Sequence, residues 1–394
     1  MRTKTDYYDY NLIAVIILLI GFGLVMLYST TSYTAAMKFG DDMMFLKKQA
    51  VFSAGAIAAA VLFSYIPYRI YWYLSGFIYI LSLLLMALVR TPLGRTVNGA
   101  RRWLGIGGFS FQPAEVAKIA VITFVPMLIV RMGKKYRKPA NTLMAAGAGI
   151  LQAAAAYILT DNLSTAIIIM MITAFIVFVA HPKTKPFLAL GFGMLAAAAG
   201  GVYFIISNEV SSSFRARRIL TWLHPEQYAS EGGYQVMQAL YALGSGGLFG
   251  KGLGNGTQKL WAVPEAENDM IFAIICEELG IFGGVIVILL FLYLLYRLFF
   301  IAQNAPDLYS ALMVTGIFGH ISMQVILNIC VVVNLIPTTG VTLPFLSYGG
   351  TSVVLLMAEI TIALSVSRAI KFRRPEQDLW GEVVRSSSGN GTKV

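Results

Sequence analysis

The chain has 394 residues, of which 57% are hydrophobic and only 12% are charged, and its formal net charge is +11. Soluble globular proteins carry about 25% charged residues, so this composition excludes a soluble enzyme or binding domain and fits an integral membrane protein with many spans. We therefore expect membrane lipid, and no nucleic acid, among its partners. The two cysteines and three histidines follow no disulfide, zinc or HExxH pattern, so no metal centre is expected from them.

Ten apolar runs follow one another along the chain, and each has the roughly 17–25 residues that one crossing of a bilayer needs. The first run has no small-residue cleavage site behind it, so we interpret it as a retained helix rather than a signal peptide. Spans of this length cannot form a strand-alternating barrel. The predicted fold class is an all-α integral membrane protein of about ten transmembrane helices, near residues 11–28, 49–66, 70–89, 114–131, 141–159, 164–180, 186–206, 269–296, 309–333 and 348–367.

Basic residues predict the orientation of these spans. Three basic stretches fall on the side of the two termini: Arg131–Lys138, His181–Lys185 and Arg368–Arg374. The positive-inside rule assigns that side to the cytoplasm, so both termini are expected there. Residues 1–370 form the predicted membrane domain, with a large extracytoplasmic loop at about 207–268 between helices 7 and 8. The polar tail, 371–394, is expected to be disordered.

The opposite, extracytoplasmic side also carries basic residues, which the positive-inside rule does not explain. They form three clusters: Lys47 and Lys48; Arg90, Arg95, Arg101 and Arg102; and Arg215, Arg217 and Arg218. One interpretation is that they anchor neighbouring helices at the interface. We favour an anionic ligand held on this face, with phosphate as the natural candidate because guanidinium groups match its geometry.

The stretch "NGARRWLGIGGFSFQPAEVAKIA" leads from one of these clusters into the fourth span. Pro113 suits the first turn of a helix. Glu115 and Lys118 then stand at i and i+3, where they can pair on one face of the helix. Preceded by Arg101, Arg102 and Trp103, they are predicted to form one wall of a charged cavity.

Two further stretches are irregular. "YALGSGGLFGKGLGNGT" holds seven glycines, but Lys251 is followed by Gly252 and the required upstream glycine is absent, so it is not a Walker A loop. "NLIPTTGVTLPFLSYGGTS" holds two prolines and three glycines between two apolar runs, and no charge. Irregular backbone at membrane depth is tolerated where it is packed in protein or lines a wet cavity, so we expect the second stretch to be re-entrant.

Three acids lie where the long loop enters the eighth span. Asp269 is at its outer edge, where a helix N-terminus favours a carboxylate. Glu277 and Glu278 follow about 12–13 Å deeper at 1.5 Å per residue. Carboxylates in that position need partners or protons. We predict a structural, pairing role for Glu277 and Glu278, whose partners the sequence does not identify.

Five stretches, in this order and spacing, resemble the SEDS family (shape, elongation, division and sporulation), in particular its FtsW and SpoVE branch. They are "NGARRW", "FQPAEVAK", "GYQVMQALYALGSGGLFGKGLG", "PEAENDMIFAIICEELG" and "PTTGVTLPFLSYGGTS". The resemblance covers roughly residues 10–370. It implies a ten-span peptidoglycan glycosyltransferase of the bacterial cytoplasmic membrane that polymerises lipid II on the outer face. The implied partners are a class B penicillin-binding transpeptidase and other division or sporulation membrane proteins.

The resemblance also implies site residues. The family's essential acid matches Asp269, its basic residue before the second helix matches Lys48, and its Arg/Trp pair matches Arg102 and Trp103. Its helix-four acid and lysine match Glu115 and Lys118. The full predicted substrate-binding set is Lys48, Arg101, Arg102, Trp103, Glu115, Lys118, Arg215, Arg218, Lys251 and Ser347.

The chain departs from the family pattern at two places. The family usually has His-Thr-Asp-Phe where this chain has Glu267 to Met270, so the neighbours of Asp269 differ while the acid is kept. The usual Pro-Asp-Leu-Gly before the sixth span reads Asp161 to Ser164 here. No role is transferred to Asn162, which replaces the family acid.

Glycosyl transfer needs a base for the acceptor hydroxyl and charge stabilisation for the leaving diphosphate. We assign the base to Asp269, in a single displacement with inversion. Lys48, Arg102 and the Arg215–Arg218 cluster are the cations expected near the diphosphate. A divalent cation, Mg or Mn, held by Asp269 could share that task, but the sequence shows no dedicated metal cage.

Two other functions compete with this one. A lipid II flippase would also use charged groups within the membrane and a broken segment. The basic clusters of the outer side argue against it, because a carrier must hold its cargo on both sides, and we interpret the cytoplasmic basic residues as serving topology only. A non-catalytic scaffold for division proteins would not need buried charges that cost several kcal/mol each.

Overall fold

A computed structural model describes residues 5–97, 99–106, 109–207, 214–229, 232–259 and 263–372. Within these ranges, ten helices are long and apolar enough to cross a membrane. They are α1 (Tyr10–Phe39), α2 (Met44–Phe63), α3 (Ile70–Leu88), α4 (Pro113–Met132), α5 (Pro139–Thr160), α6 (Leu163–Ala180), α7 (Lys185–Ser207), α10 (Ile271–Gln303), α11 (Leu308–Val332) and α12 (Gly350–Ala369). The predicted ten-helix fold class is confirmed.

Helix ends agree within about two residues with the predicted spans except at α1 and α10, which run on to Phe39 and Gln303, and at α2, which begins five residues before the predicted span and ends three before its end. Hydropathy marks where a chain leaves the bilayer, whereas a helix continues as long as its residues keep helical geometry. The α1 helix ends only at Gly40, whose left-handed φ of 72° closes the last turn. Helix α10 is interrupted at Gly280 (φ 70°, ψ −168°), so its first turns form a separate segment.

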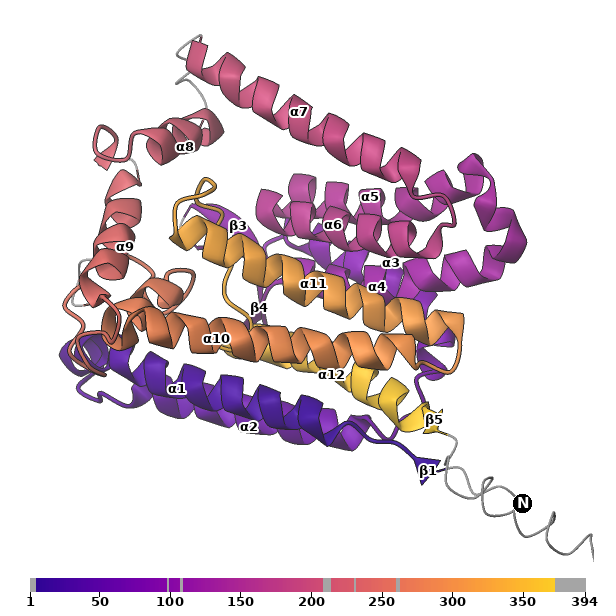
Figure 1. Ribbon diagram of the computed structural model, residues 1–394, viewed down its shortest axis with the longest axis horizontal. Coiled ribbons are helices and arrows are strands. Elements are labelled where there is room, and N and C mark those ends of the chain that lie inside the picture. The colour runs from indigo at the N-terminus through magenta and orange to yellow at the C-terminus, as the bar shows by residue number, and fades with distance from the viewer. Residues whose placement is uncertain are drawn as a thin grey trace, which may run out of the picture.

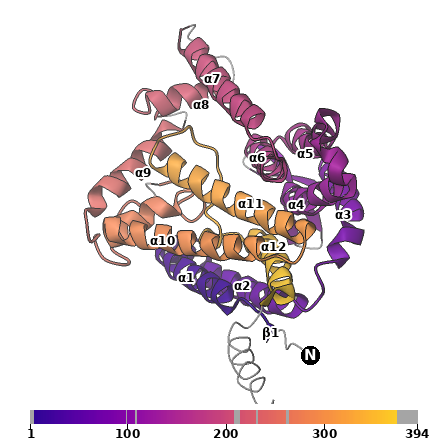
Figure 2. The same cartoon turned by 45° about the vertical axis from the view of Figure 1, so that its right-hand side comes forward.

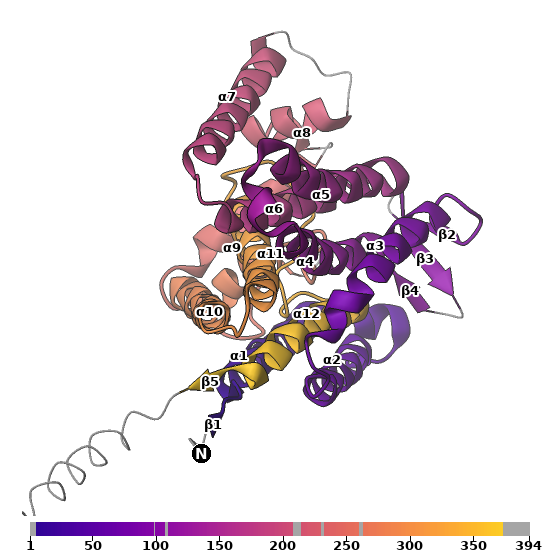
Figure 3. The same ribbon diagram turned by 90° about the vertical axis from the view of Figure 1, so that its right-hand side faces the viewer.

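The helices lie side by side in one bundle, seen from the side in Figure 1 and along its length in Figure 3. Helices α4, α11 and α12 are the most buried and form its centre. Helix α7 has no buried residue in its most apolar window and stands apart from the others in both Figure 1 and Figure 2. The packed core is therefore built by the other nine spans.

The chain ends are held together at one end of the bundle, which we name the terminal end. Strand β1 (Thr5–Asp6) pairs antiparallel with β5 (Lys371–Phe372). Next to them, the Asp9 carboxylate caps α1 by accepting from the Leu12 amide at 2.9 Å. The same carboxylate forms a buried ion pair with Arg297 of α10 at 2.7 Å. Both termini are thus on the same side, as the even number of spans predicts; residues 373–394 of the predicted tail lie outside the described ranges.

The opposite end, which we name the loop end, carries strands and short helices that were not predicted from the sequence. A three-stranded antiparallel sheet joins α3 to α4, in the order β2 (Gly94–Val97), β3 (Ala100–Ile106) and β4 (Phe109–Phe111). Between α7 and α10 are two short helices, α8 (Phe214–Leu223) and α9 (Gly233–Gly246). The long loop is therefore largely ordered where it is described.

The glycine-rich stretch after α9 lies against the first segment of α10. A Cβ added at Gly246 would meet the Cys276 carbonyl oxygen at 1.9 Å, and one at Gly250 would meet the Glu278 carbonyl oxygen at 2.1 Å. Gly250 also has a φ of 76°, which side chains rarely adopt. These glycines are needed for close backbone packing, which is how irregular backbone is tolerated beside a membrane.

Candidate active site at the loop end

Asp269 lies in the turn immediately before α10 and is only 8% exposed. Its Oδ1 atom is buried and has no hydrogen-bond partner among the residues that the structure describes. The backbone beside it is held firmly, because the Asn328 side-chain amide of α11 donates to the Asp269 carbonyl at 2.8 Å and to the Val341 carbonyl at 2.7 Å. The backbone of the turn is thus fixed, while Oδ1 of the side chain has unused hydrogen-bonding capacity within the described part of the chain.

The stretch between α11 and α12 wraps around this turn. The Ser347 hydroxyl donates to the Asn268 carbonyl at 2.6 Å, and the Tyr348 amide donates to the Glu267 carbonyl at 2.8 Å. A Cβ added at Gly340 would lie 3.9 Å from Asp269 Oδ2. The stretch therefore forms one wall beside the acid, and Ser347, itself buried, acts on the backbone next to Asp269.

Two arginines from separate elements belong to the same electrostatic cluster. Arg218 of α8 donates to the Thr338 carbonyl at 3.1 Å, and Arg102 of β3 donates to the Asp161 carbonyl at 3.0 Å. Burial lowers the pKa of both guanidinium groups; the Arg102 charge lowers that of Arg218 further, and Asp269 raises it. The two cations and the acid are therefore close enough to influence one another's charge.

The surroundings of Asp269 shift its pKa upward to about 7. Burial is the main cause, and the nearby Glu265 carboxylate adds to it, while Arg218 opposes it. Burial likewise raises the pKa of Glu267. A carboxyl with a pKa near the working pH is well matched to accepting a proton from a hydroxyl group.

Glu115 and Lys118 form the predicted pair in the first turns of α4, with 2.8 Å between the ammonium and the carboxylate. Glu115 follows Pro113 at the helix N-terminus, where the helix dipole favours its charge. The Glu115 side chain is 15% exposed and the Lys118 side chain only 2%. A ligand would therefore meet Glu115, and Lys118 would act through it.

The other predicted binding residues are spread over the loop end. Lys48 is exposed near the start of α2, next to the buried Gln49, whose side-chain oxygen accepts from the Gly349 amide at 3.3 Å. Arg101 and Trp103 lie on β3 beside Arg102, and Arg101 donates to the Thr91 carbonyl. The side chain of Arg215 lies outside what the structure describes. Lys251 is brought to a different place, where it pairs with Glu277.

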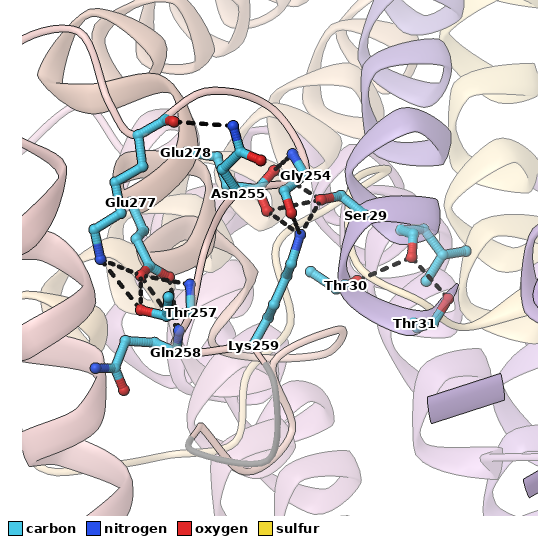
Figure 4. A network of polar contacts seen from close by, with 12 residues as sticks. Ser29, Thr30, Thr31, Gly254, Asn255, Thr257, Gln258, Lys259, Glu277 and Glu278 are labelled. Carbon is cyan, nitrogen blue, oxygen red and sulfur yellow. Dashed lines mark hydrogen bonds and ion pairs between the residues drawn. The ribbon is translucent and has the colours of Figure 1, made fainter. Parts of the chain in front are cut away.

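Glu277 and Glu278 are fully buried, and each has a lysine partner (Figure 4). Lys251 lies 2.7 Å from Glu277, which also accepts from the Thr257 amide at 2.9 Å. Lys259 lies 2.5 Å from Glu278. These are the partners that the sequence could not identify.

The Glu278 pair extends across to α1. The Ser29 hydroxyl donates to Glu278 at 2.7 Å, and the Gly254 amide donates to its other oxygen at 3.0 Å. Figure 4 shows Lys259 and Ser29 converging on the same carboxylate. The two acids thus join the glycine-rich loop, α1 and α10.

Three polar residues near this site were missed by the sequence reading: Asn328 and His320 of α11 and Glu359 of α12, all fully or almost fully buried. Each is a polar or ionisable residue inside an apolar span, which by itself is a signal of function. His320 pairs with residues of α4 and α12, and Asn328 with backbone carbonyls outside the helices, so the sequence offered no way to assign their roles.

The departure at Asn162 has a local explanation. The Asn162 side chain caps α6, accepting from the Thr165 amide at 3.1 Å, as Asn does well. The preceding Asp161 has a left-handed φ of 49° and pairs with Arg90 at 3.3 Å. Neither observation gives these residues a place in the chemistry.

No group of three or more His, Cys, Asp or Glu side chains that could hold a metal ion occurs in the part of the chain that the structure describes. Mg²⁺ often takes only one or two protein carboxylates and completes its shell with water and substrate phosphates. The Asp269 carboxylate is suited to be one such protein ligand. A cation held there would help to neutralise a diphosphate.

Comparisons with known proteins agree with the fold and the motifs. The family model described as cell cycle protein, covering FtsW, RodA and SpoVE, matches residues 9–371. Stage V sporulation protein E of Bacillus subtilis is 36% identical, over 94% of this chain and 100% of its own length. A probable peptidoglycan glycosyltransferase FtsW of Trichlorobacter lovleyi is 34% identical, over 92% of this chain and 94% of its own.

Solved structures are similar as well. A chain from a study titled "Structural coordination of polymerization and crosslinking by a peptidoglycan synthase complex" matches with a TM-score of 0.73 and 26% identity, over 92% of this chain and 98% of that one. The rod shape determining protein RodA of Thermus thermophilus matches with a TM-score of 0.65 and 26% identity, over 92% and 97% of the two chains. The protein is a multi-pass membrane protein and belongs to the SEDS family of FtsW, RodA and SpoVE.

Proposed function

We propose that this protein is a peptidoglycan glycosyltransferase that polymerises lipid II, with Asp269 as its general base. The observation that carries the proposal is the buried Asp269 carboxylate, whose Oδ1 has no hydrogen-bond partner within the described residues and whose pKa is raised to about 7. Relatives in the family are named as peptidoglycan glycosyltransferases, which supports the reaction type.

The reaction is a single displacement. Asp269 takes the proton of the acceptor sugar hydroxyl, whose oxygen attacks C1 of the donor sugar while the bond from C1 to the diphosphate oxygen breaks. The bonding electrons leave with the lipid diphosphate, and the configuration at C1 inverts. A positioned base contributes typically 10²- to 10⁴-fold to such a step.

The departing diphosphate needs fixed positive charge rather than an acid. Arg102 and Arg218 supply it from two elements, and both are held by backbone carbonyls. Preorganised cations in a partly buried site stabilise developing charge without reorganising. Lys48 and Arg215 are further basic residues of elements at the loop end of the bundle. The partly exposed Glu115 carboxylate would accept hydrogen bonds from sugar hydroxyls.

The loop end faces outward in this proposal. The basic stretch after α4, which includes Lys134, Lys135 and Arg137, lies at the opposite end and favours the cytoplasm there. Both termini are then cytoplasmic. The proposed partner is a class B penicillin-binding transpeptidase, in keeping with the similar chain that comes from a peptidoglycan synthase complex. The named relatives point to division or sporulation.

The test is polymerisation of purified lipid II by detergent-solubilised protein with its partner transpeptidase, comparing wild type with Asp269→Asn. Glycan strands from wild type, and none from the variant although it still binds lipid II, are expected. Equal product from both would remove Asp269 from the mechanism. Lipid bound by wild type without any product would favour the flippase instead.

A further inference from the structure

A row of four ionisable side chains runs through the centre of the bundle, from α4 across α11 to α12. Lys118 contacts Glu115 at 2.8 Å, and its ammonium lies 2.9 Å from His320 Nε2. On the other side of the ring, His320 Nδ1 lies 2.7 Å from a Glu359 oxygen. We name these residues the buried tetrad.

The tetrad extends from the loop end toward the middle of the membrane. Glu115 is in the first turn of α4, whereas Glu359 lies nine residues into α12, about 13 Å along the helix at 1.5 Å per residue. His320 and Glu359 are buried, and only Glu115 reaches the surface of the site. Burying charges costs several kcal/mol per ion, and apolar residues of similar size often stabilise a protein at least as well. The row is therefore a functional feature by default.

Hydrogen-bond chemistry fixes how the protons are arranged. A lysine ammonium can only donate, so His320 Nε2 must accept from Lys118. The proton of the neutral ring is then on Nδ1, where it donates to the Glu359 carboxylate. Glu359 thus sets the tautomer of His320, in the manner by which a carboxylate orients a histidine in many sites.

We propose that His320 and Glu359 are positioning residues for substrate binding, acting through Lys118 on Glu115. His320 holds the Lys118 ammonium in place, and that ammonium, 2.8 Å from the Glu115 carboxylate, keeps it directed toward the sugar hydroxyls of lipid II. The inference rests on the proposed glycosyltransferase function. Helix α11 supports the reaction at two points, because Asn328 of the same helix holds the Asp269 backbone.

His320 Nε2 contacts Lys118 and Nδ1 contacts Glu359, so two substitutions that each replace one of these nitrogens can be compared. A Gln side chain can present its amide oxygen near the position of Nε2 and accept from Lys118. An Asn side chain reaches only about as far as Nδ1 and cannot. We expect His320→Asn to raise the KM for lipid II about tenfold with a smaller change in kcat, because one charge-assisted hydrogen bond is lost. His320→Gln should stay within about threefold of wild type.

The measurement is steady-state polymerisation of lipid II by the full chain with its partner transpeptidase, together with thermal unfolding of each variant. Gln152→Met is the matched control, since Gln152 is a buried polar residue of α5 that bonds to Ser82 of α3, away from the tetrad. It should leave KM unchanged. An equal KM for the two His320 variants, or an unchanged KM in His320→Asn, would overturn the inference alone, whereas no product from wild type would overturn the proposed function with it.

If His320→Asn does not fold, Glu359→Gln carries the test. The amide oxygen still accepts from Nδ1, but the bond is no longer charge-assisted and is about half as strong. We expect KM to rise about two- to threefold. An unchanged KM in this folded variant would show that Glu359 does not act through the ring.

Discussion

Asp269 and the pair Glu277 and Glu278 belong to one short stretch of chain, yet their surroundings are opposite. Each glutamate is fully buried with a lysine within 2.7 Å and backbone amides on its oxygens. Asp269 is almost as buried, but among the described residues its Oδ1 has no hydrogen-bond partner, and Arg218 of the same cluster donates to the Thr338 carbonyl. Burial alone therefore does not separate a structural acid from a reactive one; the partners do.

The comparison has an energetic meaning. A buried carboxylate with a lysine and several amides is compensated, and removing either partner leaves an uncompensated charge. The uncompensated oxygen of Asp269 costs stability in the absence of substrate. Residues held in this way are typical of catalytic sites, where groups are arranged for the reaction rather than for the fold.

The largest effect on activity is expected from neutralising Asp269, which tests whether it differs in role from Glu277 and Glu278. Asp269→Asn should lower the polymerisation rate by about 10²- to 10⁴-fold, because the base is lost. The same change should leave the melting temperature equal or higher, since a carboxyl whose pKa is raised in the folded state stabilises it only while protonated. That stability is present below the unfolded pKa and is lost as pH rises through about 7, so the variant's advantage in melting temperature should grow from pH 4 to pH 7.

Glu267→Gln is the control for Asp269→Asn. It removes the carboxylate of the residue two positions before Asp269. The backbone carbonyl of Glu267, which accepts from the Tyr348 amide in the stretch before α12, is kept. Most of the activity should remain. Equal losses in Glu267→Gln and Asp269→Asn would mean that local charge, and not a base at Asp269, supports the reaction.

The opposite outcome is expected at the structural acids. Glu278→Gln leaves Lys259 buried without a counter-charge and should destabilise the protein by about 3–5 kcal/mol. Adding Lys259→Met should restore much of the loss, because both charges are then gone. Thermal unfolding in detergent measures both effects, and activity per folded molecule should change little. A Glu278→Gln variant as stable as wild type but inactive would move Glu278 into the chemistry.

The fold was largely predictable because one property decides it. Apolar runs of sufficient length must become helices in a bilayer, so all ten spans could be placed from hydropathy alone. The sheet β2–β4 could not be foreseen in the same way. Its strands are short, and the pairing of Arg95 with Trp103 depends on a hairpin at the loop end rather than on a run of residues.

The site was only partly predictable. Asp269 stood out because it is an acid where a loop enters a span, and Glu115 with Lys118 stood out because their spacing fits a helix face. The contact of Asn328 with the Asp269 backbone, and of His320 with Lys118, joins residues far apart in sequence. Lys251 was placed in the outer loop by its position in the sequence, and the structure adds that its ammonium pairs with Glu277; its predicted role in substrate binding stays a prediction.

The pH dependence of the wild-type kcat/KM gives a second test of Asp269 as the reactive acid. The ionised form of Asp269 is the base, and its pKa is about 7. The value of kcat/KM should therefore fall about tenfold for each pH unit well below 7 and level off above it. The groups acting on Asp269 are Glu265, Glu267 and Arg218. Rates measured from pH 5 to pH 9 would test this, and a flat profile in that range would exclude a base with this pKa.

The smallest expected effects come from the neighbours that tune Asp269, and their signs are opposite. Glu265 raises the pKa of Asp269, so Glu265→Gln should move the acid limb of the profile to lower pH. Arg218 lowers that pKa, so Arg218→Gln should move the limb to higher pH and also raise the KM for lipid II if this guanidinium binds the diphosphate. Each shift should be below about one pH unit, because both charges act through partly exposed surroundings. Shifts in the same direction would contradict this assignment, because removing a negative charge lowers, and removing a positive charge raises, the pKa of a group that both charges reach.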